Sequence, residues 1–273
     1  MPIARAKALK FPALLSIGII GSLLLLTLIV PQLLHGDPLA LTDDILQPPS
    51  ARHWFGTDDL GRDVLVEIIY GTRVSFLIGC AAALATAVAG TAIGSLGGFF
   101  GGVTDTVVTR LAEFFQVMPT FILAVVIVAL AGPGLIRVVA VIALLSWPQT
   151  ARVVRGEVLR LSRLDFVDAL RCVGITEWRI LTFEIIPNAV GPVFALGALI
   201  VGNAILLEAS LSFLGLSDPS VISWGRLLSA GQRFLFSAWW LSLFPGLAIL
   251  ITVLAFNLLA DGLRDMFDPR HAK

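Results

Sequence analysis

Charged residues are scarce in this sequence. Asp, Glu, Lys and Arg make up only 14% of its 273 residues, while 57% are hydrophobic. Ordinary soluble domains carry about 25% charged residues. The acidic and basic residues number 19 each, so the formal net charge is zero. This composition excludes an ordinary soluble enzyme and a disordered chain, and it argues against a nucleic-acid binder, which should be visibly basic.

Residues that commonly carry chemistry are also few. The two cysteines, Cys80 and Cys172, and three scattered histidines supply neither a disulfide framework nor the ligand spacing of a zinc site. Lysine occurs only at positions 7, 10 and 273, so the chain contains no Gly-x-x-x-x-Gly-Lys-Ser/Thr loop to hold nucleotide phosphates. No serine lies in a Gly-x-Ser-x-Gly turn. We therefore expect a non-enzymatic chain with two structural thiols, no bound metal and no cofactor of its own.

Long apolar runs are abundant instead. A helix that crosses the hydrocarbon core of a bilayer needs roughly 20 apolar residues. Five uncharged runs meet this length and are predicted to be membrane spans: residues 11–34, 74–104, 114–136, 185–207 and 234–260. A sixth run, residues 138–151, is short and ends near Pro148. It is either a short span that starts nearer Gly132 or a re-entrant segment.

The positions of the basic residues favour six spans over five. Cytoplasmic loops of membrane proteins carry an excess of Lys and Arg. With six spans, the basic N-terminus, the Arg-rich segment 149–184 and the basic C-terminus all lie on the same side of the membrane. Five spans would separate them. The sequence therefore predicts an all-α polytopic membrane protein with six transmembrane helices and both termini in the cytoplasm.

The predicted organisation follows from these spans. Residues 1–10 form a cytoplasmic N-terminus and residues 11–34 the first transmembrane helix. Residues 35–73 form an extracytoplasmic segment, in which Pro48-Pro49 and the glycines favour turns over a folded domain. Residues 74–262 hold the other five spans and a cytoplasmic loop at 149–187. Residues 263–273 form the cytoplasmic C-terminus.

The Arg-rich segment 149–184 has a regular pattern of its own. Arginines alternate with Leu, Val and Phe at the spacing of an amphipathic helix. Gly174 suits the end of that helix, where a positive φ is needed. The Thr176 hydroxyl can cap a short helix that follows, and Pro187 lies near the entry to the next span. We predict a helix, a tight turn, a short helix and then the membrane; the alternative is a solvated basic loop that only fixes topology.

Few polar groups lie within the predicted spans. Glu208, followed one turn later by Ser212, stands near the outer end of the fifth span and is the best candidate for a transport pathway. The alternative is a helix-end residue near the lipid headgroups. A proton- or sodium-driven carrier tends to show several such carboxylates or broken helices, which this sequence lacks. Small residues at every fourth position predict close helix packing at Gly94, Gly98 and Gly102.

The segment 168–187 resembles the signature of a known family. Asp168-Ala169-Leu170, Gly174 and Ile186-Pro187 match the spacing of the EAA motif of ATP-binding-cassette (ABC) importer permeases. That motif is Glu-Ala-Ala, three residues, Gly, nine residues and Ile-x-Leu-Pro. Asp168 replaces Glu, Leu170 replaces the second Ala, and Glu184 and Ile186 stand at the Ile and Leu positions.

Several other stretches are similar to one branch of that family, the second permease of the dipeptide, oligopeptide and nickel importers. They lie at residues 53–63, 70–75, 98–105, 211–216, 223–225 and 257–269. The family usually has Gly where Ser217 and Ala260 stand. The resemblance covers most of the chain and implies the type I ABC importer permease fold, with an ABC transmembrane type-1 domain over residues 74–262.

The resemblance also implies a set of partners in a bacterial or archaeal cytoplasmic membrane. These are a homologous second permease, two cytoplasmic ATPase subunits that bind ATP and Mg, an extracytoplasmic substrate-binding protein and the lipid bilayer, with no nucleic acid. One ATPase would receive the coupling loop, whose predicted residues are Asp168, Ala169, Leu170, Gly174, Ile175, Thr176, Glu177, Ile186 and Pro187.

The predicted function is that of a permease subunit in an ATP-driven importer of di- or oligopeptides. Within the same branch, the alternative substrate is nickel or a metal–chelator complex, because the motifs are shared. Hypotheses of other classes are a stand-alone secondary carrier and a membrane scaffold or enzyme accessory.

Overall fold

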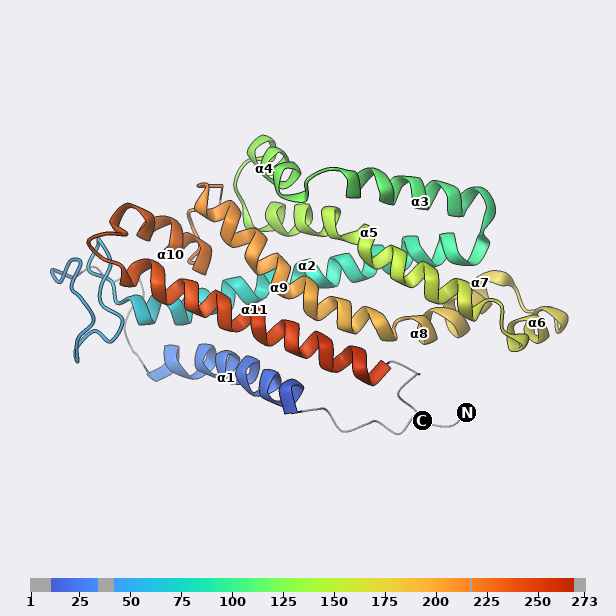
Figure 1. Ribbon diagram of the computed structural model, residues 1–273, viewed down its shortest axis with the longest axis horizontal. Helices are drawn as coiled ribbons and strands as arrows, with labels where there is room; N and C mark the ends of the chain where they lie inside the picture. Colours follow the sequence, from blue (N-terminus) through green and yellow to red (C-terminus); the bar gives the residue numbers. More distant parts are fainter. Residues whose placement is uncertain (1–10, 34–41, 217, 268–273) are drawn as a thin grey trace.

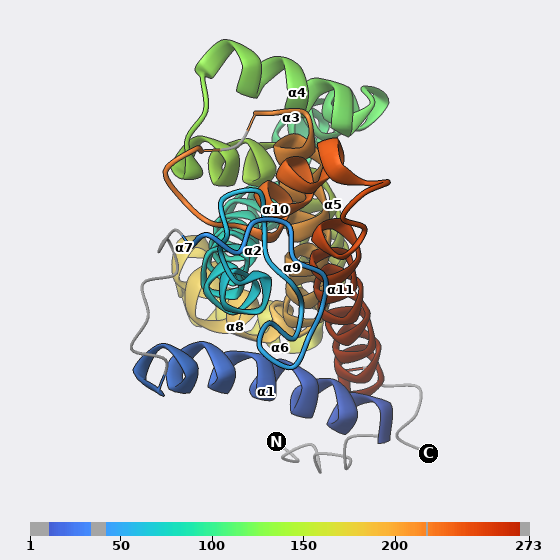
Figure 2. The same ribbon diagram turned by 90° about the vertical axis from the view of Figure 1, so that its left-hand side faces the viewer.

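A computed structural model of the chain describes residues 11–33, 42–216 and 218–267. The predicted N-terminal segment 1–10 and the last residues of the C-terminal segment lie outside this part. Within it, the elements are helices joined by turns, and no strand is present apart from one isolated bridge between Thr57 and Asp63. Most of the long helices run along the long axis of the molecule, whereas the first one, residues 11–33, lies obliquely across it (Figures 1 and 2).

Five helices of the described chain are long and apolar enough to cross a membrane. They are α1 (Phe11–Leu33), α2 (Val64–Phe100), α5 (Leu135–Leu161), α9 (Gly191–Phe213) and α11 (Trp240–Phe267). A sixth crossing results if α3 (Gly102–Val117) and α4 (Thr120–Ala131) form one bent span. The predicted all-α, polytopic fold class is confirmed.

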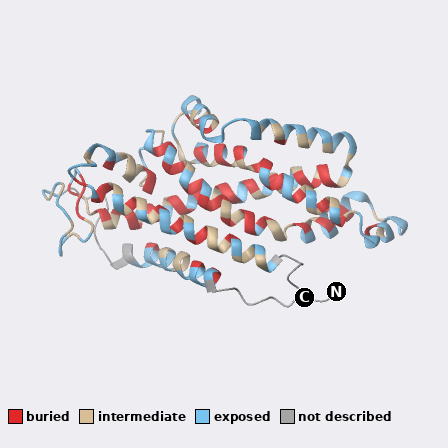
Figure 3. Cartoon of the chain, in the orientation of Figure 1, coloured by how far each residue is buried: buried red, intermediate tan, exposed pale blue. Residues whose placement is uncertain are grey.

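Helix α2 lies at the centre of the bundle. It packs against α5 and α9, and α11 packs against α9 and α1. Helix α1 lies along one side of the bundle, and α3 and α4 lie on the opposite side (Figures 1 and 2). Buried side chains concentrate on α2, α5 and α9, whereas α1 and α4 expose most of their apolar side chains (Figure 3). Exposed leucines and valines on the outer helices suit contact with lipid.

The second span begins before the predicted residue 74. Asp63 caps α2, because its Oδ1 accepts hydrogen bonds from the N–H groups of Leu65 and Val66 at 2.9 and 3.3 Å. The helix therefore starts at Val64 and takes in the last residues of the predicted extracytoplasmic segment. The predicted span started too late because it was taken from the uncharged run alone, and the first turns of α2 contain the charged residues Glu67 and Arg73.

The predicted span over residues 114–136 differs from the structure in its bounds and is broken into two helices. Helices α3 and α4 meet at an angle of 88°. Pro119 lacks the N–H that would continue α3, and Met118 before it is extended (φ −80°, ψ 138°), as residues preceding proline prefer. Pro119 was the residue in the sequence that could have indicated this break.

The run at residues 138–151, predicted to be a short span or a re-entrant segment, belongs to a longer span that starts at Leu135, near Gly132. Helix α5 is one continuous helix of 27 residues that runs through the buried Pro148 to Leu161. Proline is tolerated inside transmembrane helices, because neighbouring helices and local adjustments satisfy the freed carbonyl. The first part of the predicted loop 149–187 therefore belongs to this helix.

The fifth and sixth spans begin later than predicted. Helix α9 starts at Gly191, because the preceding residues form η1 (Ile180–Ile185) and α8 (Ile186–Ala189). Helix α11 starts at Trp240, because α10 (Trp224–Gly231) and the 3₁₀ turn η2 (Gln232–Phe234) occupy the residues before it. The length of an uncharged run therefore did not predict where α9 and α11 begin.

Glycines bring α2 and α5 into backbone contact. A Cβ on Gly98 would lie 2.6 Å from the Arg155 carbonyl oxygen, and a Cβ on Gly94 would overlap the Ala151 carbonyl. Gly102 takes no part in this packing. It follows the end of α2 with φ +54°, and nothing lies within 4 Å of its Cβ position.

We predict opposite signs for two Gly-to-Ala changes. Gly94→Ala should lower the free energy of unfolding by about 1–3 kcal/mol, because the added methyl collides with the α5 backbone. Gly197→Ala in α9 meets nothing within 4 Å and should raise it by about 0.5–1 kcal/mol, because alanine loses less backbone entropy in a helix. Thermal unfolding in detergent measures both, and equal shifts would contradict the close contact.

Candidate functional site

Polar residues gather at the two ends of the bundle. At one end, α6 (Asp165–Cys172) and α7 (Glu177–Arg179) project beyond the long helices (Figure 1). At the opposite end lie α10 and the loop over residues 42–63 (Figures 1 and 2). The predicted coupling residues belong to the first end, and Glu208 lies toward the second.

The amphipathic segment forms two helices, so the predicted single helix is wrong. Helix α5 ends at Leu161, a short turn covers residues 162–164, and α6 follows. The interruption turns Val167 toward the bundle, where it is fully buried. Val167 packs in one cluster with Val158 of α5 and with Ile180 and Ile185 of η1. The apolar side of α6 is therefore fixed to the end of the bundle.

A tight turn ends α6 at Gly174, which has φ +84° as predicted. The Gly174 N–H donates to the Arg171 carbonyl at 2.9 Å, and the Ile175 N–H donates to the Leu170 carbonyl at 3.1 Å. This pair of bonds is the Schellman motif, and its usual apolar contact is present because Leu170 and Ile175 pack against the same cluster. The direction of the chain after α6 is thus set by backbone hydrogen bonds.

Arg171 links the helices on both sides of this turn. Its guanidinium lies 3.1 Å from Asp168 Oδ1 and 3.0 Å from Glu177 Oε1, and it stands over the ring of Phe99 at the end of α2. The hydrogen bond with Glu177 raises the pKa of Arg171 above its usual range. The Asp168 side chain remains 69% exposed. The charges of α6 therefore stabilise the turn while leaving its outer side open.

The short helix after the turn differs from the prediction in two ways. Thr176 occupies the N-cap of α7, but its hydroxyl makes no capping hydrogen bond. Helix α7 also continues into η1, whose last turn is wide: the Ile186 N–H donates to the Leu181 carbonyl. Pro187, which has no N–H, follows at the start of α8. Wide π-type turns occur frequently at functional sites. Pro187 is the residue of the sequence that indicates this wide turn.

At the opposite end, Glu208 is buried and lies beside Ser212. Its Oε1 accepts hydrogen bonds of 2.7 Å from the hydroxyls of Ser212 and of Ser223, the N-cap of α10. Its Oε2 is buried without a hydrogen-bond partner among the described residues. Ser223 is a neighbour that the sequence pattern did not reveal. Glu208 thereby joins α9 to α10.

Helix α10 is held down by Trp224, which is fully buried. The Trp224 backbone N–H donates to Ser75 Oγ at 3.2 Å, and its ring Nε1 donates to the Ile68 carbonyl at 2.9 Å. Gly225 follows at a position where a Cβ would lie 2.6 Å from the Ala209 Cα. Helix α10 is therefore fixed against both α2 and α9.

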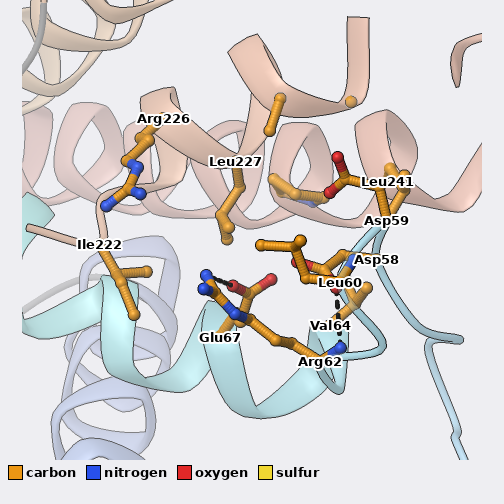
Figure 4. Close-up of a pocket in the computed structure, with 13 residues that line it drawn as sticks. Asp58, Asp59, Leu60, Arg62, Val64, Glu67, Ile222, Arg226, Leu227 and Leu241 are labelled. Atoms are coloured by element: carbon orange, nitrogen blue, oxygen red, sulfur yellow. Dashed lines mark hydrogen bonds and ion pairs between the residues drawn. The ribbon is translucent and has the colours of Figure 1, made fainter. Parts of the chain in front are cut away.

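A cavity of about 210 Å³ lies between this end of α2, α10 and the loop (Figure 4). Glu67 is buried in its wall, with Oε1 at 3.6 Å from Arg62 Nη1, and Arg226 of α10 lines it too. The Asp58 carboxylate accepts hydrogen bonds from the N–H groups of Leu60 and Arg62, but burial raises its pKa above the usual range. No cluster of metal ligands is present in the described part of the chain.

The loop at this end is built of turns, as predicted for its described residues 42–63. Phe55 stacks on Phe244 of α11 with ring centroids 4.0 Å apart. The Trp240 ring Nε1 donates to the Thr57 carbonyl at 3.1 Å. These contacts fix the loop to the start of α11 without a folded domain.

Known proteins resemble the chain over most of its length. Residues 90–273 match the family described as "Binding-protein-dependent transport system inner membrane component". The chain belongs to this family. It is therefore a transport permease, and the resemblance to ABC importer permeases is confirmed. The matched region includes α6, the Gly174 turn and Glu208.

Curated relatives of the permease carry peptide-related names. It is 39% identical over 269 residues to the dipeptide transport system permease protein DppC of Alkalihalophilus pseudofirmus, covering 97% of this chain and 88% of the relative. It is 40% identical over 228 residues to the oligopeptide transport system permease protein OppC of Bacillus subtilis, covering 83% and 75%. It is 39% identical over 229 residues to the glutathione transport system permease protein GsiD of Pectobacterium atrosepticum, covering 84% and 76%.

We predict that the Gly174 turn tolerates asparagine better than valine. Gly174→Val should open α6 locally by about 1–2 kcal/mol, because a side chain pays this cost in the left-handed region. Gly174→Asn should retain more of the protection, since asparagine adopts this conformation more readily. Hydrogen exchange of the α6 amides, followed by mass spectrometry, compares the two. Equal protection in Gly174→Val and the wild type would contradict the requirement for a positive φ.

We also predict that Glu208 holds α10 through its hydrogen bonds. Glu208→Ala leaves the buried hydroxyls of Ser212 and Ser223 without an acceptor, and it should destabilise this contact by about 1–3 kcal/mol. Glu208→Gln keeps an acceptor oxygen of the same reach and serves as the control. Limited proteolysis at α10 reports the difference. If both variants are cleaved at the wild-type rate, Glu208 does not anchor α10.

Proposed function

We propose that this permease forms one half of the translocation pathway of an ATP-driven importer of di- and oligopeptides. Its relatives named as dipeptide, oligopeptide and glutathione permeases support a peptide substrate. The permease has no phosphate-binding loop, so ATP and Mg are bound by two ATPase subunits of the complex. A homologous second permease completes the pathway, and an extracytoplasmic binding protein delivers the peptide.

The coupling end of the permease is the part from α6 to α8, which holds Asp168, Ala169, Leu170, Gly174, Ile175, Thr176, Glu177, Ile186 and Pro187. The observation that carries this proposal is the set of contacts that fix α6 to the bundle. Val167 anchors one side of α6 in the bundle, the Gly174 turn fixes its end, and Arg171 bridges it to Glu177. A rigid element transmits a partner's movement to the spans, whereas a flexible loop absorbs it.

The outer side of α6 is open for an ATPase. Ala169 is exposed and lies two residues after Val167, which is close to the opposite side of the helix. The neighbouring side chains of Phe166 and Asp168 are exposed as well. This surface combines an apolar ring with an accessible carboxylate, as a surface that docks a second protein requires.

We propose that α6 lies on the cytoplasmic side of the membrane. The end of the bundle with α6 and α7 carries Arg160, Arg163, Arg171 and Arg179, and an excess of arginine marks cytoplasmic loops. Both chain termini share this side in a six-span arrangement. The end with α10 and the mixed-charge cavity then faces the binding protein.

Reconstitution of the complete complex tests the substrate. Proteoliposomes are prepared with the permease, the second permease, the ATPases and the binding protein. ATP is supplied on the side of the membrane where the ATPases lie. Uptake of a labelled dipeptide that depends on ATP hydrolysis is expected. Uptake of a nickel chelate instead of the dipeptide would show that the substrate is a metal complex. Uptake by the permease alone, driven by an ion gradient, would show that it is a secondary carrier.

We predict that Ala169→Arg uncouples the complex. A bulky, unpaired charge at the docking surface should weaken ATPase binding by roughly a hundredfold or more, because burying an uncompensated charge costs about 3–5 kcal/mol. ATP-dependent uptake and co-purification of the ATPases should both fall, while membrane insertion is retained. The matched control is Ala51→Arg, an exposed alanine at the opposite end. Wild-type ATPase binding in Ala169→Arg would contradict the proposed docking surface.

A further inference from the structure

Two amide side chains stand exposed in the middle of long helices. Gln149 lies in α5 and Asn203 in α9, and both are exposed. Neither side chain forms a hydrogen bond with any residue that the structure describes. Ser146, one turn before Gln149, likewise has no hydrogen-bond partner among those residues. These three side chains are therefore left without a hydrogen-bond partner in the part of the chain that the structure describes.

Lipid is an unfavourable neighbour for these groups. Asn203 lies at least about 15 Å from either end of α9 at a rise of 1.5 Å per residue, so its amide does not reach the headgroups. An amide without a hydrogen bond in an apolar medium costs about 2–7 kcal/mol. Water, a substrate or another polar protein surface must therefore lie against this face of α5 and α9.

The same face borders the break in the third span. Gln116, at the end of α3, and Thr120, at the start of α4, line a pocket of about 480 Å³ together with Ser146, Gln149 and Asn203. Non-helical backbone at membrane depth is tolerated only where it is buried in protein or lines a water-filled cavity. The bend of 88° is thus a second observation, independent of the amides, that water or protein rather than lipid lies at this place.

The lining of this pocket mixes polar and apolar side chains. It contains three amides, two hydroxyls and apolar side chains such as Ile142 and Leu207, and none of the residues that line it is charged. The Gln116 amide oxygen accepts a hydrogen bond from Arg152, which leaves the Gln116 N–H groups available. By contrast, a second pocket of about 460 Å³ beside α9 and α11 is lined almost wholly by apolar residues such as Phe213 and Leu250. The two surfaces therefore suit different neighbours.

We propose that the amide pocket, formed by Gln116, Thr120, Ser146, Gln149 and Asn203, is the mid-membrane section of the permeation path. It is filled with water when empty and contacts the backbone of the passing peptide. Amides and hydroxyls both donate and accept hydrogen bonds, so they replace the water around peptide N–H and C=O groups. Because none of the lining residues is charged, the pocket itself offers no ion-pair partner to charged peptide side chains. This inference rests on the proposed peptide importer function.

Accessibility to water is tested by cysteine labelling in the assembled transporter. The native thiols are first removed by Cys80→Ser and Cys172→Ser, because both are free and exposed. Asn203→Cys is then compared with Leu84→Cys, an exposed residue in the apolar middle of α2. A cationic, membrane-impermeant methanethiosulfonate should modify Asn203→Cys at least about tenfold faster, since a thiol ionises only where water reaches it.

Labelling is measured without nucleotide and in the vanadate-trapped state, because a path opens to one side at a time. Fast reaction of Asn203→Cys in either state supports the proposal. Reaction as slow as that of Leu84→Cys in both states would overturn it and would assign this face to a dry contact with the second permease.

Contact with the substrate is tested by adding a charge. Asn203→Asp should raise the ratio of Lys-Lys to Glu-Glu uptake by about fivefold or more relative to the wild type, because one charge at contact distance in water has an effect of this size. Taking the ratio of variant to wild type cancels the preference of the binding protein. Asn203→Gln keeps the neutral amide and should leave the ratio unchanged. An unchanged ratio in an active Asn203→Asp transporter would overturn the substrate contact.

The two tests separate this inference from the proposed function. If the wild-type complex transports no dipeptide, the proposed peptide function is wrong, and so is the proposed contact of the amide pocket with the peptide backbone. The labelling result still decides whether the pocket holds water.

Discussion

The structure depends on one constraint: a polar group within the bilayer must have a hydrogen-bond partner. The constraint accounts for the low charge content of the chain and for the burial of Glu208 between two serine hydroxyls. It also draws attention to two exposed amides, Gln149 and Asn203, that have no hydrogen-bond partner among the described residues. Lipid cannot satisfy amides, so the face that carries them belongs to the interior of a larger, water-containing assembly.

Close packing turns the two polar ends into parts of one body. Gly94 and Gly98 let the backbones of α2 and α5 touch, and α5 continues through Pro148 to the apolar cluster that holds Val167 of α6. The same α5 contributes Ser146 and Gln149 to the amide pocket. A movement imposed on α6 is therefore passed along α5 to the pocket without a flexible joint in between.

Most of the architecture could be predicted from the sequence, because apolar runs and arginine positions report on the bilayer directly. The Gly174 turn was also predictable, since few residues besides glycine adopt a positive φ readily. The ends of the helices could not be predicted in the same way, because charged residues such as Glu67 and Arg73 lie inside the first turns of α2. Ser223 contacts Glu208, and Gln116 and Asn203 line one pocket. These residues are far apart in the chain, and hydrophobic periodicity does not report such neighbours.

The central claim is that α6 moves with α5 as a rigid unit. One spin label is attached to the native thiol Cys172 of α6, which is free and exposed, and the other to Gly156→Cys in α5, where a side chain meets nothing within 4 Å, after Cys80→Ser has removed the second native thiol. The distance between the two labels is measured in the assembled transporter. The account predicts one narrow distance distribution that is the same without nucleotide and in the vanadate-trapped state. A distribution that broadens or shifts between the two states would show that α6 moves independently of the bundle and would contradict the account.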